Sequence, residues 1–122
     1  MLKNKKILCV VIIIIGILLI GSIRYLMVGN EVNTNSLFVK NIDVNNDKLY
    51  IAGLTINSGE AFAGYDYTIE NENLYLKLRY TIVNQFHGNG DFSITINDNL
   101  MNIKKIYLQG KESEDLKLVW TN

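Results

Sequence analysis

Two hydrophobic patterns divide the chain. From Ile7 to Ile23 every residue is apolar or small, whereas after Ser36 short runs alternate between apolar and polar positions. A long unbroken apolar run predicts a membrane-spanning helix, and alternation with a period of two predicts half-buried β-strands. The polar segment 29–36 between the two patterns predicts a short linker.

The apolar run predicts a helix that stays in the membrane. A helix over residues 7–23 covers about 25 Å, slightly less than the roughly 30 Å of bilayer hydrocarbon. The span is completed by residues up to Val28, because Arg24 can reach the headgroups and Tyr25 suits the interface. We therefore expect a transmembrane helix over residues 7–28 that binds membrane lipid.

Two processed forms are less favoured alternatives. A cleaved signal peptide has a shorter apolar region followed by small residues in an A-x-A-like pattern, which neither Gly21-Ser22 nor Val28-Gly29 provides. A bacterial lipoprotein carries its modified cysteine after the apolar run, whereas Cys9 lies at the beginning of this one.

Positive charge near the helix ends predicts the orientation. Lys3, Lys5 and Lys6 precede the apolar run and outnumber Arg24, which places residues 1–6 in the cytoplasm and residues 37–122 outside the cell. We thus expect a single-pass protein of the cell membrane. Since Cys9 is the one cysteine, the outer domain can form neither a disulfide nor a catalytic thiolate.

The alternating runs predict an all-β domain. Turns rich in Asn, Asp and Gly separate the runs at regular spacing, and no helical periodicity interrupts them. The residues predicted to face the core are Leu74, Leu76, Leu78, Tyr80, Ile82, Phe92, Ile94, Ile96, Ile106, Leu108, Leu116, Leu118 and Trp120. This pattern favours a seven-stranded immunoglobulin-like β-sandwich over residues 37–122, with a small β-barrel as the alternative.

Charge and motif content argue against nucleic-acid binding and catalysis. All Asp and Glu residues lie at or after Glu31, so the predicted domain lacks the basic surface that nucleic acid requires. Asp43, Asn45 and Asp47 match the opening of an EF-hand loop, but Lys48 stands where that loop needs glycine. His87 lies in a turn without an evident second ligand. We expect no enzyme activity, no cofactor and no metal.

Outward-facing tyrosines and basic residues predict a contact face. Tyrosine and arginine are enriched at binding hot spots, although outward aromatic residues also serve cross-strand pairing alone. The candidate contact face comprises Tyr50, Tyr75, Lys77, Arg79, Lys105 and Tyr107.

The second half of the chain carries recurring structural motifs. A Y-x-Y-x-I segment begins at Tyr65, a long alternating strand follows, and "IKKIYLQG" precedes a final apolar-Trp pair. Residues 50–120 thereby resemble small uncharacterised secreted or membrane-tethered proteins of Bacillus and Clostridium relatives. The resemblance implies an extracytoplasmic β domain and no particular activity. Some of those proteins look like lipoproteins with a lipobox, which this chain lacks.

Taken together, these patterns predict a membrane-anchored accessory module. We expect a non-enzymatic domain that contacts an envelope protein or a cell-surface ligand. The alternative is a small structural or regulatory subunit recognised through its transmembrane helix. Gly16 and Gly21 do not have the spacing of the close-packing motif that such recognition often uses.

Overall fold

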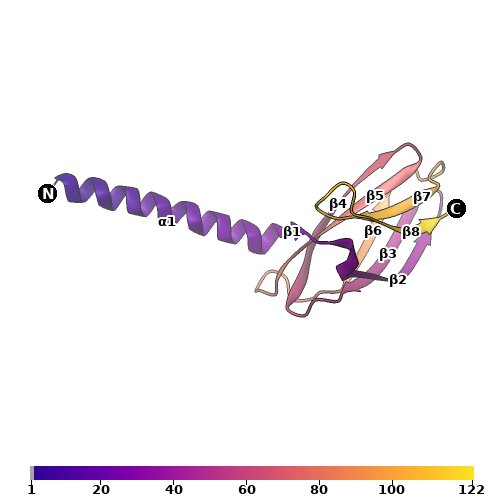
Figure 1. Cartoon of the computed structure of the whole chain (residues 1–122), viewed down its shortest axis with the longest axis horizontal. Coiled ribbons are helices and arrows are strands. Elements are labelled where there is room, and N and C mark those ends of the chain that lie inside the picture. Colours follow the sequence, from indigo (N-terminus) through magenta and orange to yellow (C-terminus); the bar gives the residue numbers. More distant parts are fainter. Residues whose placement is uncertain (1) are drawn as a thin grey trace.

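The N-terminal apolar run forms one long helix. In the computed structural model, which describes residues 2–122, α1 spans Leu2–Val28 and projects away from a β domain (Figure 1). Its segment Asn4–Val28 is long and apolar enough to cross a membrane, and its most apolar stretch is not buried against the domain. A membrane span and a signal sequence both have these properties.

The rest of the described chain forms two β-sheets. The larger sheet contains β1 (Asn30–Glu31), β4 (Glu60–Glu70), β5 (Asn73–Ile82), β7 (Lys105–Gln109) and β8 (Leu116–Thr121). The smaller sheet contains β2 (Leu37–Val44), β3 (Lys48–Thr55) and β6 (Phe92–Asn97), and a short 3-10 helix, η1 (Thr34–Ser36), precedes β2. The strands of the smaller sheet are ordered β2-β3-β6, and those of the larger sheet β4-β5-β7-β8, with β1 added to β5.

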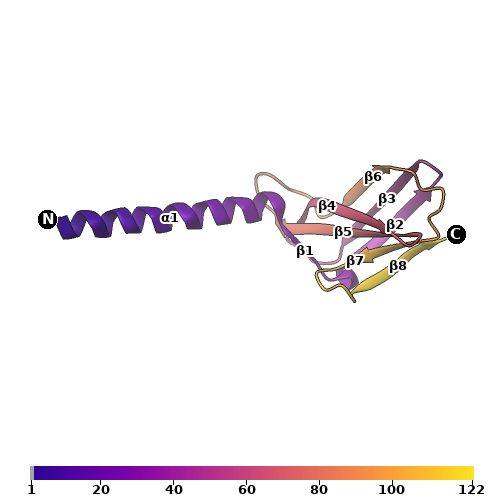
Figure 2. The ribbon, with the colours of Figure 1, turned by 90° about the horizontal axis from the view of Figure 1, so that it is seen from above.

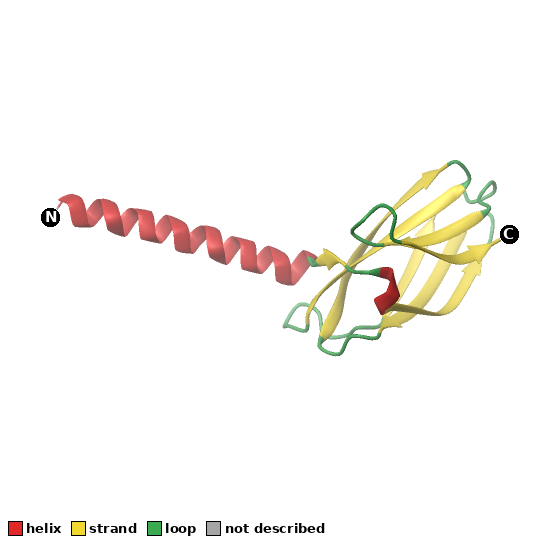
Figure 3. Cartoon of the chain, in the orientation of Figure 1, coloured by secondary structure: helices red, strands yellow, loops and turns green. Residues whose placement is uncertain are grey.

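The two sheets are open and lie face to face (Figures 2 and 3). The β-barrel alternative is therefore wrong: β2 and β8 end their sheets without pairing to each other. All pairings are antiparallel except that of β5 with β7, which is parallel because the chain passes through β6 in the other sheet between them. The structure has one strand more than the seven predicted, because the two-residue β1 is too short to produce a recognisable apolar pattern.

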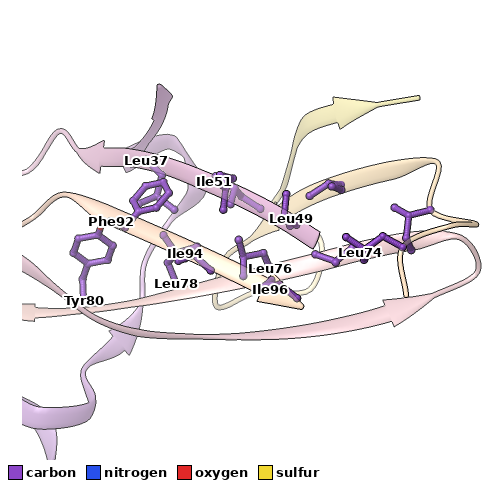
Figure 4. Packing of buried hydrophobic residues seen from close by; sticks show 14 residues of the cluster. Leu37, Leu49, Ile51, Leu74, Leu76, Leu78, Tyr80, Phe92, Ile94 and Ile96 are labelled. Carbon is purple, nitrogen blue, oxygen red and sulfur yellow. The ribbon is translucent and has the colours of Figure 1, made fainter. Parts of the chain in front are cut away.

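The core lies between the sheets and follows the predicted alternation. Leu74, Leu76, Leu78 and Tyr80 on β5 face the buried side chains of β3 and β6 (Figure 4). The inward positions predicted on β5 up to Tyr80, on β6 and on β7 are confirmed, since all are nearly inaccessible to solvent. Ile82 is the exception on β5: it is 60% exposed, at the strand end beside α1.

The predicted orientation of β8 is wrong for Leu116 and Leu118, whereas Trp120 packs against the core as predicted. Leu116 and Leu118 are 42% and 49% exposed, whereas Val119 packs against the core. A register shift between Ile106 and Tyr107 adds one residue to β8 and changes the face that its side chains occupy. Lys117 takes an inward-facing position, from which its Nζ donates to the carbonyl of Leu37 at 2.9 Å.

Residues 29–36, expected to form a linker, are folded onto the domain. Asn30 and Glu31 pair with the end of β5, Val32 packs against the core and Thr34 is buried. Backbone pairing with β5 and the buried hydroxyl of Thr34 hold this segment in place. Neither contact requires a periodic pattern of apolar residues, so the sequence did not reveal it. The helix consequently joins the domain directly, with few free residues between them.

Candidate functional site

A stacked pair of tyrosines lies at the centre of the larger sheet's outer face. Tyr75 on β5 and Tyr107 on β7 are register partners, and the parallel pairing places their side chains on the same side. Their ring centroids are 5.5 Å apart with an angle of 11° between the planes. Stacked rings present a broad, rigid surface that is apolar on its faces and polar at its hydroxyls, as partner recognition requires.

Leu118 extends this pair across the next strand. It is the register partner of Tyr107, so Tyr75, Tyr107 and Leu118 form one row across β5, β7 and β8. Leu116 is exposed near the end of the same strand. Sequence reasoning assigned both leucines to the core, because the extra residue in β8 cannot be read from apolar alternation.

Two lysines flank the row. Lys77 lies two residues after Tyr75 and opposite Asp66 of β4, where its side chain is half-buried. Lys105 lies two residues before Tyr107 and is exposed. The contact face, defined from here on as Tyr75, Lys77, Lys105, Tyr107 and Leu118, therefore combines an apolar centre with positive charge on either side.

Arg79 lies on the same side of β5 as Tyr75 and Lys77, as predicted, but its guanidinium is engaged with the helix end and is therefore left out of the contact face. Its guanidinium lies over Gly64, where a side chain on β4 would collide with it. The Nη1 donates to the carbonyl of Val28 at 3.0 Å. The Nε is 3.2 Å from Oδ2 of Asp66, an ion pair without hydrogen-bond geometry. Arg79 thus holds the end of the helix.

Tyr50 also lies apart from the contact face. It is exposed on β3 of the smaller sheet, where its hydroxyl is 3.4 Å from Oγ of Ser93. The outer faces of two stacked sheets point in opposite directions, so one partner surface does not reach both. Strand alternation predicted that Tyr50 points outward but not the sheet to which it belongs.

A small cavity opens beside Tyr75. Its volume is about 180 Å³. The residues that line it are Glu31, Asp66, Tyr67, Thr68, Tyr75 and Lys77. The hydroxyl of Tyr67 donates to Oδ2 of Asp98 at 2.8 Å, and this hydrogen bond, with smaller effects of burial and nearby charge, raises the pKa of Tyr67. Tyr67 packs against the core, so its hydroxyl is occupied by the opposite sheet.

A second cluster of polar side chains caps the C-terminal end of α1. The last carbonyls of a helix have no partner within it. Here Asn84 Nδ2 binds the carbonyl of Leu26 at 3.2 Å and His87 Nε2 binds that of Met27 at 2.6 Å. Since a carbonyl oxygen only accepts, Nε2 of His87 carries the proton in this contact. We call Arg79, Asn84 and His87 the helix cap.

The helix cap places positive charge where a helix favours it. The last turn of α1 contains no basic residue of its own, so Arg79 supplies the cation that complements the negative end of the helix dipole. The sequence offered little signal for this arrangement, because its members are separated from the helix by 51 to 60 residues. The solitary histidine is a signal, but its sequence context indicates a turn residue and not a helix cap.

The structure also bears on metal binding. Within residues 2–122, no cluster of three or more His, Cys, Asp or Glu side chains has a geometry that could hold a metal ion. The EF-hand-like residues lie in the β2–β3 hairpin, where the Oδ1 of Asn45 accepts from the N–H of Asp47 at 3.4 Å. That contact is typical of an Asx turn.

Comparisons with known proteins identify no relative from which a function of the contact face or the helix cap could be inferred. No family model, curated protein or solved structure matches the chain. The resemblance of residues 50–120 to membrane-tethered bacterial proteins stays an expectation. The contact face and the helix cap are therefore the two features from which function is argued.

Proposed function

We propose that the protein is a membrane-anchored module whose extracytoplasmic β-sandwich binds an envelope protein or a cell-surface ligand through the contact face. The observation that carries this proposal is the row of Tyr75, Tyr107 and Leu118 between two lysines. Leu118 is 49% exposed and the two tyrosines are partly exposed, and apolar surface rimmed by polar residues marks interaction sites. The module acts by binding and not by catalysis.

The helix cap supports retention of α1 as the anchor. Three side chains of the domain are committed to carbonyls in the last turn of the helix. Cleavage at Val28-Gly29 would remove that turn and leave the polar groups of Asn84 and His87 without these partners. Cleavage at Gly21-Ser22 would leave the turn in place, and that position is disfavoured by its lack of an A-x-A-like pattern. A retained helix with Lys5 and Lys6 at its start places the N-terminus in the cytoplasm and the domain outside.

The chemistry of the contact face indicates the class of partner. Lys77 and Lys105 favour a partner surface with carboxylate or phosphate groups on either side of an apolar centre. The stacked rings between them provide the apolar contact that stabilises a bound complex. Nucleic acid is not proposed, because two lysines neutralise too few phosphates to support stable binding.

We further propose that the sandwich is immunoglobulin-like in its connections. The β2-β3-β6 order of the smaller sheet and the repeated crossing between sheets support this assignment. The parallel pairing of β5 with β7 departs from the antiparallel sheets of that fold.

Crosslinked capture from native membranes tests the binding proposal. The intact protein with Lys77→Glu and Lys105→Glu is expected to lose the crosslinked species that the wild type retains. The matched control is Lys40→Glu with Lys48→Glu, which makes the same charge change at exposed residues of the smaller sheet. Arg79 is left unchanged because it caps the helix.

Two outcomes would contradict the proposal. Equal loss of capture in both charge-reversed proteins would mean that general charge, and not the contact face, recruits the partner. Loss of capture on replacing residues 7–23 by an unrelated apolar helix would instead favour recognition through the membrane span. Retention of capture after that replacement is expected here.

A further inference from the structure

The loop between β5 and β6 exposes apolar side chains next to the helix. Residues 83–91, which we call the helix-side loop, follow Ile82 and extend beside the C-terminal end of α1 (Figure 2). Val83 and Phe86 are 46% and 45% exposed, and Ile82 is 60% exposed. A soluble end of a β-sandwich would normally carry polar residues at these positions.

The apolar surface of α1 continues onto this end of the domain. Ile82 lines a shallow groove together with residues of the last three turns of the helix. The helix residues of that groove are Ile17, Leu18, Gly21, Ser22, Tyr25 and Leu26. The apolar surface of the helix thus continues to Ile82 of the domain, and no charged residue lines the groove between them.

The side chains of Asn84 and His87 in the helix-side loop bind the helix end, whereas Gln85 and Asp91 are exposed. Asn84 uses its Nδ2 on the carbonyl of Leu26 and its Oδ1 to accept from the N–H of Phe86 at 2.8 Å. His87 binds the carbonyl of Met27. From Ile82 to Gly90 the sequence contains no Asp, Glu, Lys or Arg. Moving residues 82–90 out of water would therefore desolvate no charged Asp, Glu, Lys or Arg side chain, whereas exposed Asp91, the last residue of the loop, must remain in water.

A neighbouring turn adds to the same surface. The N–H of Val83 donates to the carbonyl of Gly59 at 2.9 Å, which holds the turn between β3 and β4 against the helix-side loop. Ile56 in that turn is among the more exposed large apolar residues of the domain. Ile56, Ile82, Val83 and Phe86 therefore lie at one end of the sandwich.

We propose that these four residues, Ile56, Ile82, Val83 and Phe86, sit in the interfacial region of the bilayer that α1 spans. The inference rests on the proposed membrane anchor. Lipid is the occupant because the apolar surface is continuous with the helix, and because the helix cap prevents the loop from turning away from the helix end. The contact face is then held away from the bilayer surface, because about 23 Å of strand separates Tyr75 from Ile82.

Quenching by brominated lipid tests this inference. The full chain, in vesicles of phosphatidylcholine with brominated acyl chains, carries a single tryptophan in a Trp120→Phe background. Phe86→Trp is expected to lose most of its fluorescence, as is Tyr25→Trp on the helix. Met101→Trp, at a 63% exposed position toward the opposite end of the domain, is expected to keep its fluorescence.

Each other pattern overturns a defined part of the proposal. Quenching at position 25 without quenching at position 86 refutes the lipid contact and leaves the anchor intact. No quenching at position 25 refutes the anchor and the inference with it. Equal quenching at positions 86 and 101 refutes the specific role of this end. A parallel series that retains Trp120, with wild-type quenching subtracted, decides the result if Trp120→Phe does not fold.

Discussion

Thr34 and Asp115 are joined by two hydrogen bonds although 81 residues separate them. The N–H of Thr34 donates to Oδ2 at 3.0 Å, and its hydroxyl donates to Oδ1. Thr34 is only 2% exposed, and Gly110 lies so close to Asp115 that a side chain there would collide with the carboxylate. The segment that follows the helix is in this way attached to the turn between β7 and β8.

Asp115→Ala is expected to lower the free energy of unfolding by about 2–3 kcal/mol, because it leaves two donors of a buried residue without an acceptor. Urea denaturation of the full chain in detergent micelles measures this loss. Glu112→Ala removes an exposed carboxylate from the same turn and should change stability by less than about 0.5 kcal/mol. Equal losses in the two variants would show that the Thr34 contact contributes nothing specific.

Tyr80 predicts how stability changes at alkaline pH. Burial, with smaller contributions from the charges of Asp91 and Glu60, raises the pKa of Tyr80 above its ordinary value. The unfolded phenol titrates near 10, as tyrosine usually does, so unfolding releases protons at higher pH. The stability that this tyrosine contributes is fully present below about pH 10 and declines as the pH rises toward the folded pKa.

Tyr80→Phe is therefore expected to reduce the alkaline decline seen between pH 9 and pH 11. At pH 8 the same variant should lose about 1 kcal/mol, because the hydroxyl donates to the carbonyl of Gly90 at 2.9 Å. Urea unfolding at several pH values gives both quantities. Tyr50→Phe, at an exposed phenol, should keep the wild-type decline, and an unchanged slope in Tyr80→Phe would disprove the assignment.

The sequence predicted those parts of the fold in which one face of a strand is buried along its whole length. On β6, Phe92, Ile94 and Ile96 alternate with exposed residues, so burial and pattern agree. On β8 an extra residue opposite β7 changes the facing side chains, and no apolar pattern reports such an insertion. Two-residue β1 gives no pattern at all, since its pairing depends on the position of β5.

The candidate site was predicted in part for the same physical reason. Tyr75 and Tyr107 could be recognised as outward-facing from their own strands. Their stacking could not, because it requires β5 and β7 to be parallel neighbours. Tyr50 and Arg79 were grouped with them by residue type, whereas sheet membership separates the first and the helix end occupies the second.

Gly53 provides a test of close packing between β2 and β3. A Cβ at this position would collide with the carbonyl of Phe38 and come within 2.7 Å of the Phe92 ring. Gly53→Ala is therefore expected to cost about 3 kcal/mol, as overpacking of a core does. Gly88→Ala, where no atom lies within 4 Å, should be neutral or stabilise by up to about 1 kcal/mol. Chemical denaturation compares the two, and similar effects would refute the packing argument.

Arg79 makes two contacts that could hold the helix at a fixed angle to the domain, an ion pair with Asp66 and a hydrogen bond to the carbonyl of Val28. Its ion pair with Asp66 is weak, because the Asp66 side chain is 67% exposed and such pairs contribute about 0–1 kcal/mol. Its hydrogen bond to Val28 gives a partner to a backbone carbonyl that has none within the helix. The cap, and not the ion pair, should therefore fix the angle between helix and domain.

Spin labels at Ile20→Cys and Ser93→Cys, in a Cys9→Ser background, report that angle as a distance distribution in nanodiscs. The distribution should be narrow in the otherwise unchanged protein and broaden in Arg79→Met. Asp66→Asn removes the ion pair alone, and Lys77→Met makes the same kind of truncation two residues earlier on β5. Both should remain narrow. Broadening in Asp66→Asn but not in Arg79→Met would reverse the assignment, because the joint would then depend on surface charge and not on the capped carbonyl.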